Sequence, residues 1–246
     1  MRTRPIALMI GFAAFYLVLS LLPGIPVIGL PQLSIELEAS FASLAGAIGG
    51  PAYGFLGILI GSLLSLTYGG ARIYLVPFAA CPAFNALVTG LIFSSRVKLS
   101  IIALATPITL FWLTPVVQPL NENWYVGLAA TFDKIIALAL VLFLPKVLPK
   151  CNESRKSGII GFLLVFFVGM QADASLGSLI FATPLIYQSI FSLSPETVRI
   201  LFLINPLVYP VIRLLQALLA ALIGFPVYKF LDRRGLKWVY PSIREH

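Results

Sequence analysis

The chain has 246 residues, of which 59% are hydrophobic and only 11% charged, with a formal net charge of +8. Its mean hydropathy is +0.99. Soluble domains carry about 25% charged residues, so the composition excludes a soluble globular domain and indicates an all-α, polytopic membrane protein. The alternating segments of a transmembrane β-barrel are not seen. Apolar runs recur almost from end to end, and we expect a single transmembrane domain over residues 1–246.

Apolar runs and helix breakers predict eight transmembrane helices, with six or seven spans as alternatives. The first run is longer than the apolar core of a signal peptide, so it is interpreted as a retained helix. The stretch 179–192 is apolar enough for a half-helix or an interfacial segment. The predicted helices are 5–22, 34–49, 51–68, 76–95, 99–118, 124–146, 158–178 and 206–231.

Lysine and arginine indicate the orientation of these helices. With eight spans, most basic residues fall on the face that holds both termini, and the positive-inside rule makes that face cytoplasmic. The opposite loops hold only Arg72 and Arg199. We therefore expect a multi-pass protein of the cell membrane, in contact with lipid. Orientation explains the basic charge, so no nucleic-acid partner is expected.

Residues 36–61 combine two acids with many glycines and one proline (ELEASFASLAGAIGGPAYGFLGILIG). Small side chains cover about half of the helix expected before Gly50, which is typical of close helix packing in membranes. Gly50 and Pro51 predict a turn, because proline is tolerated at the start of the following helix. Gly54, Gly57 and Gly61 continue a small stripe along that next helix. The pattern predicts a tightly packed hairpin.

Charged and polar residues recur in the outer part of several predicted helices, whereas the inner parts hold no comparable charge. Each buried charge costs about 2.5–3.5 kcal/mol on insertion scales, so such groups must pair with each other or face a hydrated cavity. We expect either a site open to the outside for a polar, zwitterionic or weakly charged small molecule, or a self-paired structural network. The candidate substrate-binding residues are Glu36, Glu38, Arg72, Asn85, Asp133, Lys134, Gln171, Asp173 and Arg213.

Enzymatic and metal chemistry find little support in the sequence. The one histidine is His246, which excludes an HExxH zinc site and most histidine-rich metal sites. Neither a GxSxG nucleophile motif nor a Walker motif is present. We expect no catalytic residue, no metal and no cofactor.

The chain resembles the substrate-binding S components of energy-coupling-factor (ECF) transporters. The residues that carry this likeness are Gly50-Pro51 with Gly54, Gly57 and Gly61, the long outer loop PGIPVIGLPQLS and the final helix ALIGFPVYKFLDRR. The likeness covers mainly 5–95 and 158–232, a six-helix core, and leaves 99–146 as an additional helical hairpin.

The resemblance implies a division of labour between subunits. Such a component captures a vitamin-like or micronutrient molecule from outside, beneath the loop that follows the first helix, and hydrolyses nothing itself. It docks on a transmembrane coupling subunit, which two cytoplasmic ATPases energise. Docking uses small residues on the first helix, for which Ala7 and Gly11 are the candidates.

Two other functions remain open. A proton-coupled secondary transporter would use Asp133 or Asp173 as the titrating carboxylate. A structural or assembly protein of the membrane would bind no small molecule. An intramembrane enzyme would need a catalytic motif, and the chain offers no GxGD and no histidine partner for Cys81.

Overall fold

The computed structural model describes residues 3–27, 30–35, 38–67, 73–148 and 154–234. These residues are mostly helical, and a short two-stranded sheet lies between the first two helices. The elements are α1 (Thr3–Leu19), β1 (Ile25–Val27), β2 (Leu30–Ile35), α2 (Glu38–Ser65), the 3-10 helix η1 (Ile73–Ala79), α3 (Ala80–Phe93), α4 (Val97–Trp112), α5 (Leu120–Val147), α6 (Arg155–Phe181), α7 (Pro184–Tyr187) and α8 (Pro195–Arg233).

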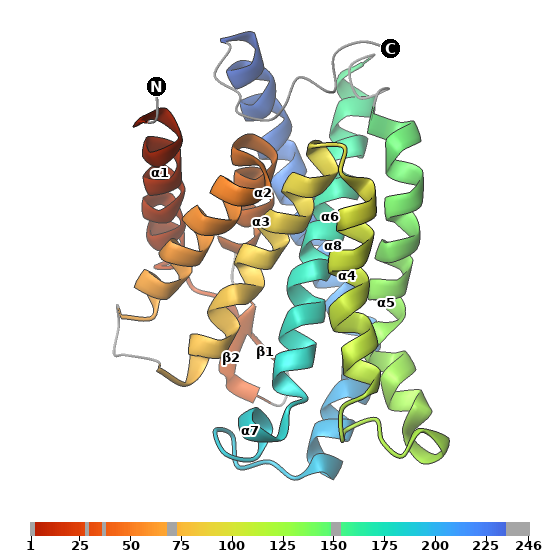
Figure 1. The fold of residues 1–246 in the computed structure, drawn as a ribbon. Helices are drawn as coiled ribbons and strands as arrows, with labels where there is room; N and C mark the ends of the chain where they lie inside the picture. Colours follow the sequence, from red (N-terminus) through yellow and green to blue (C-terminus); the bar gives the residue numbers. More distant parts are fainter. Residues whose placement is uncertain (1–2, 28–29, 36–37, 68–72, 149–153, 235–246) are drawn as a thin grey trace.

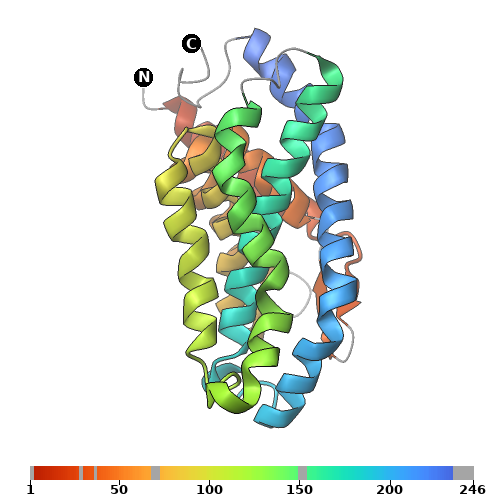
Figure 2. The same cartoon turned by 90° about the vertical axis from the view of Figure 1, so that its right-hand side faces the viewer.

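Five segments of the described chain are long and apolar enough to cross a membrane, so the chain has the character of a multi-pass membrane protein. They are Glu38–Thr67, Tyr74–Phe93, Leu120–Val147, Arg155–Phe181 and Val208–Leu231. The helices Pro5–Leu19 and Val97–Trp112 are apolar but shorter. The eight-span count therefore stays a prediction. Figure 2 shows α4, α5, α6 and α8 running along the long axis of the bundle.

The segment α2 is a hairpin rather than one straight helix. Gly50 has φ 70° and ψ −177°, which interrupts the helix and lets 51–65 fold back beside 38–49. Glycine suits this position because a positive φ costs it little, and Pro51 then starts the second arm. At about 1.5 Å per residue, the arms are roughly 18 and 22 Å long. Each is shorter than the apolar thickness of a bilayer, about 30 Å, so Glu38–Thr67 is long enough by residue count but does not cross as one straight helix.

Glycines hold this hairpin close to its neighbours. A Cβ at Gly54 would lie 2.8 Å from the carbonyl oxygen of Ala45 in the first arm. The predicted hairpin packing is therefore present at Gly54, but Gly57 and Gly61 have a different partner. Cβ atoms there would lie 2.9 Å from the Cβ of Phe12 and 2.9 Å from the Cβ of Tyr16, both on α1. The GxxxG pair thus packs α2 against α1.

The first arm of α2 also packs tightly against α3. A Cβ at Gly46 would collide with the carbonyl oxygen of Ala86 on α3, and a Cβ at Gly90 of α3 would lie 2.7 Å from Pro51 Cα, at the hairpin turn. Every residue from Ala42 to Gly50 is buried. This arm is therefore central in the bundle, as the run of small residues predicts.

Several helix limits differ from the sequence-based expectation, and the helix expected over 99–118 ends at Trp112. Residues 30–35, part of which was assigned to a helix over 34–49, form β2, in which Ile35 pairs with Ile25 of β1. The last helix begins at Pro195 instead of 206, although its membrane-crossing part, Val208–Leu231, agrees with the expected 206–231. Pro206 and Pro210 lie inside α8. Within 179–192, α6 continues to Phe181 and α7 follows as a short helix.

The two ends of the bundle differ in charge. The start of α1, the α3–α4 turn, the end of α5, the start of α6 and the end of α8 lie together at one end, which we call the basic end (top of Figure 1). The α4–α5 connection and α7 lie at the other end, which we call the α7 end. The described basic residues of the basic end are Arg96, Lys98, Lys146, Arg155, Lys156, Lys229, Arg233 and Arg234. Under the positive-inside rule, the basic end would face the cytoplasm.

Two separate hydrophobic clusters form the interior. The large core lies toward the basic end and is centred on five aromatic residues, Phe93, Phe162, Phe166, Phe225 and Tyr228. The small core lies toward the α7 end and consists of Phe111, Val116, Val117, Val126, Ala130, Phe181, Ala182, Ile186, Tyr187, Val198 and Phe202. Edge-to-face ring pairs stabilise both cores, for example Phe93–Phe162 and Phe111–Phe202, each with ring centroids 5.0 Å apart.

Candidate functional site

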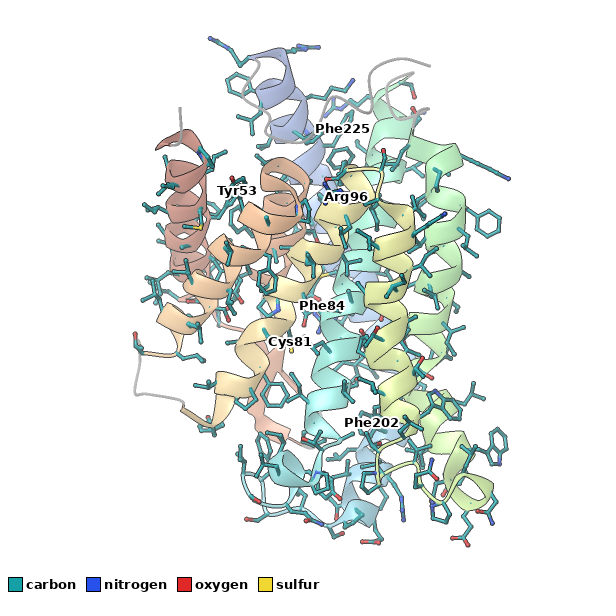
Figure 3. The ribbon with its side chains drawn as sticks, viewed as in Figure 1. Tyr53, Cys81, Phe84, Arg96, Phe202 and Phe225 are labelled. Atoms are coloured by element: carbon teal, nitrogen blue, oxygen red, sulfur yellow. The ribbon has the colours of Figure 1, made fainter. Side chains whose placement is uncertain are left out.

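Polar side chains separate the two hydrophobic cores on α5, α6 and α8, and the buried thiol of Cys81 on α3 lies beside them. On α5, Asp133 and Lys134 stand between Ala130 of the small core and Ala137 of the large core. Figure 3 shows Cys81 between Phe202 toward the α7 end and Phe225 toward the basic end. We call the set the polar layer; its members are Cys81, Asp133, Lys134, Asp173, Arg213 and Gln216. Sequence reasoning had placed four of these six in a site.

Asp133 and Lys134 form an ion pair within α5. Lys134 Nζ lies 2.9 Å from Asp133 Oδ1, and the backbone N–H of Lys134 donates to the same oxygen at 3.0 Å. Both side chains are buried. Because the residues are adjacent, each charge is neutralised by an opposite charge on the same helix. This pairing reduces the free-energy cost of burying either charge inside a membrane.

Asp173 and Arg213 form a second pair, which joins α6 to α8. Arg213 Nη1 lies 3.5 Å from Asp173 Oδ2 and donates a 3.2 Å hydrogen bond to Gln216 Oε1. The two side chains are 10% and 12% exposed. The buried Nε–H of Arg213 finds no hydrogen-bond partner among the described residues. The guanidinium is therefore held at one nitrogen and leaves other donors unused.

The two ion pairs lie near one another. Arg213 is within electrostatic range of Lys134 and of Cys81, and Asp173 is also within range of Cys81. A Cβ at Gly177, one turn after Asp173, would lie 3.7 Å from the sulfur of Cys81. Helices α3, α5, α6 and α8 thus bring their polar residues together in the bundle interior.

The first turn of α2 reaches the same region. Ser40 Oγ donates to the backbone oxygen of Gln216 at 3.4 Å. Glu38, directly at the start of this arm, is only 1% exposed. Two other candidates, Glu36 and Arg72, lie outside the described residues.

Asn85 belongs to a buried hydrogen-bond network that holds α2, α3 and α6 together. Its Oδ1 accepts from Ser43 Oγ at 2.8 Å and from Thr89 Oγ1 at 3.1 Å. Its Nδ2 donates to the Ala39 carbonyl oxygen at 3.0 Å and to Met170 Sδ at 3.7 Å. All four hydrogen-bonding positions of the amide are used. The network therefore gives Asn85 a role in helix packing, and its expected role in substrate binding stays a prediction.

Gln171, in contrast to Asn85, is buried without hydrogen-bond partners among the described residues. Its side chain is 0% exposed, and neither amide atom has a hydrogen-bond partner in the part of the chain that the structure describes. A buried polar group left in this condition costs about 1–3 kcal/mol. Gln171 is thus, like Arg213, a candidate with hydrogen-bonding capacity still available.

Sequence reasoning gave no site role to Cys81 or Gln216 and did not find the partners of Asn85. Thr89 had a detectable signal, because a residue four positions after Asn85 shares its helix face. Gln216 had a similar signal, because it follows Arg213 by three positions on α8. Ser43 lies on another helix than Asn85, and no local pattern relates the two. Among the described residues, no group of three histidine, cysteine, aspartate or glutamate side chains could hold a metal ion.

The outward face of α1 carries the candidate docking residues. Ala7, Gly11 and Ala14 are exposed on it, between larger exposed residues such as Ile10. A Cβ at Gly11 would meet nothing within 4 Å. The opposite face of α1, with Phe12 and Tyr16, packs on α2.

Comparison of the chain with protein-family models, curated proteins and solved structures gave no match.

Proposed function

We propose that this chain is the membrane-embedded substrate-binding component of an ECF-type importer. In this role it captures a small vitamin-like molecule at the polar layer from the α7 end. It then docks through α1 on a transmembrane coupling subunit, and two ATPases bound to that subunit drive release into the cytoplasm. The chain itself carries out no chemistry.

The observation that carries the proposal is the polar layer. Three helices, α5, α6 and α8, contribute charged or polar side chains between two hydrophobic cores, where a membrane protein without a polar ligand would gain stability from apolar side chains. Intramembrane charges of this kind mark substrate or ion pathways. The unused hydrogen-bonding groups of Gln171 and Arg213 further support a ligand.

The shape of α1 supports a partner in the membrane. Small residues on an exposed helix face let a second helix approach closely, and Ala7, Gly11 and Ala14 provide such a face. Because α1 packs on α2 through its other side, docking there would leave the polar layer undisturbed.

Co-purification from the native host tests this function. We expect a tagged chain to retain a coupling subunit and two ATPases. Gly11→Leu should abolish their retention while the variant folds normally, because the added side chain projects into open space. Thr109→Leu, also exposed but on α4, is the matched control and should retain them.

Recovery of no membrane partner with the tagged chain would contradict the proposal. Equal recovery with Gly11→Leu would contradict the docking face alone.

A proton-coupled secondary transporter is the second candidate. It is favoured by the two buried carboxylates of the polar layer, Asp133 and Asp173, since such groups serve as proton carriers in membrane pumps. Uptake by the purified chain in proteoliposomes, driven by a pH gradient and lost in Asp133→Asn or Asp173→Asn, would favour it over the importer. If the chain recovers no partner, takes up no substrate and binds no ligand, the structural or assembly role is the function that remains.

A further inference from the structure

We propose that the ligand of the polar layer carries a single carboxylate, which Arg213 binds through its guanidinium fork. This inference rests on the proposed binding function and adds the chemical class of the ligand. Lys134 and Arg213, the two cations of the layer, differ in how completely their N–H donors are paired.

Arg213 is the less completely paired of the two. Lys134 has a carboxylate at 2.9 Å on its own helix. Arg213 Nη1 lies 3.5 Å from Asp173 Oδ2, and the same nitrogen donates a hydrogen bond to Gln216 Oε1 at 3.2 Å. Its Nε–H is buried without a partner in the described chain. A guanidinium has five N–H donors, and most of these remain for another acceptor.

The position of Arg213 suits an anion. Two cations from different helices, Lys134 on α5 and Arg213 on α8, lie within electrostatic range of each other. Their mutual repulsion falls when a negative group binds beside them. Nε–H with a neighbouring Nη–H forms the planar fork that recognises carboxylates and phosphates through two parallel hydrogen bonds.

The charge of the layer selects between these two anions. Asp133 and Asp173 already place two negative groups beside the cations. A phosphate monoester would add about 1.5 to 2 negative charges at neutral pH, whereas a carboxylate adds one. The smaller repulsion favours a monocarboxylate.

Binding to the purified full-length chain in detergent tests the inference. Nicotinate, pantothenate and biotin are compared with the neutral counterparts nicotinamide, pantothenol and biotinamide, and inorganic phosphate is included. We expect at least one acid to raise the melting temperature and to bind, and its neutral counterpart to do neither.

Two variants of α8 connect this result to the fork. Arg213→Lys keeps the charge but lacks the fork, and we expect it to weaken binding of that acid by about tenfold to a hundredfold. Arg199→Lys, on the same helix near the α7 end, should bind as the parent does. Arg213→Gln should bind no acid, and the lysine variant keeps the test interpretable if the glutamine variant fails to fold.

Four results would overturn the inference: equal shifts from acids and neutral counterparts, a shift from phosphate alone, unchanged affinity in Arg213→Lys, or no shift from any of the three acids. Recovery of the coupling subunit and ATPases is measured separately. Failure of the carboxylate inference is therefore distinguishable from failure of the proposed function.

Discussion

Gly54 in the second arm of α2 lies so close to Gly46 in the first arm that a Cβ at position 54 would be 2.9 Å from Gly46 Cα. Real side chains do not tolerate such a distance from backbone atoms, so the hairpin can close only with glycine there. This contact holds the two arms together after the turn at Gly50.

Gly54→Ala should therefore destabilise the protein. We expect an overpacking cost of about 1–3 kcal/mol, seen as a lower melting temperature in detergent. Gly11→Ala is the control, since its Cβ meets nothing within 4 Å, and it should melt like the parent. Normal melting of the Gly54 variant would contradict the close packing of the arms.

Gly57→Leu and Gly61→Leu should damage the packing of α1 on α2. A Cβ at either glycine would lie only 2.8–2.9 Å from backbone and side-chain atoms of α1, so a leucine must displace that helix. We expect low yield and loss of partner recovery, because α1 also carries the docking face. A Gly61→Leu variant with parental yield and melting would show that α1 is held in another way.

Asn85→Ala should remove a buried network without touching the polar layer. The hydroxyls of Ser43 and Thr89 would lose their acceptor, and we expect a loss of about 1–3 kcal/mol. Thermal unfolding measures the loss, and ligand affinity in the folded fraction should stay unchanged. A selective loss of affinity at unchanged melting temperature would return Asn85 to the ligand site.

The Asp173–Arg213 pair should show strong coupling. Asp173→Asn alone leaves Arg213 with less compensation in a buried position, where breaking an ion pair costs about 3–5 kcal/mol. The double variant Asp173→Asn with Arg213→Gln should recover part of that loss, as a double-mutant cycle on melting would measure. Additive effects would indicate that the two groups do not interact.

Arg199 should stabilise the α4–α5 connection. Its Nε–H donates to Val116 O at 2.9 Å, and Nη2 donates to Gln118 O at 3.2 Å. Arg199→Ala should speed hydrogen exchange of the amides in 113–118 with little change elsewhere. Glu196→Gln is the control, because the Glu196–Arg199 ion pair is long, at 3.9 Å, and exposed on the glutamate side, and such pairs contribute little.

Much of the hairpin was predictable because its causes are local. Gly50-Pro51 combines a residue that accepts positive φ with one that begins a helix, and the structure turns there. The partner of Gly57 and Gly61 was not predictable in the same way. A small stripe shows that something packs closely, but α1 and the first arm were both available.

In the candidate site too, local features were predictable from the sequence and contacts between helices were not. Buried charges in apolar helices were visible as exceptions to composition, and Asp133, Lys134, Asp173 and Arg213 lie in one layer. Asn85 was an exception of the same kind, yet its partners are protein groups from α2 and α6. Whether a buried polar group meets a ligand or the protein depends on its neighbours on other helices.

The sequence by itself determined that this chain is a helical, multi-pass membrane protein. It also determined where the chain folds back and which residues place charges inside its apolar helices. Those properties depend on run length, backbone preference and transfer energy, which act within one segment. Only the tertiary structure decided that two cores enclose a polar layer, that Asp173 meets Arg213, and that Asn85 serves packing. These outcomes depend on how each helix is rotated about its axis against the others, and helical periodicity alone leaves that rotation open.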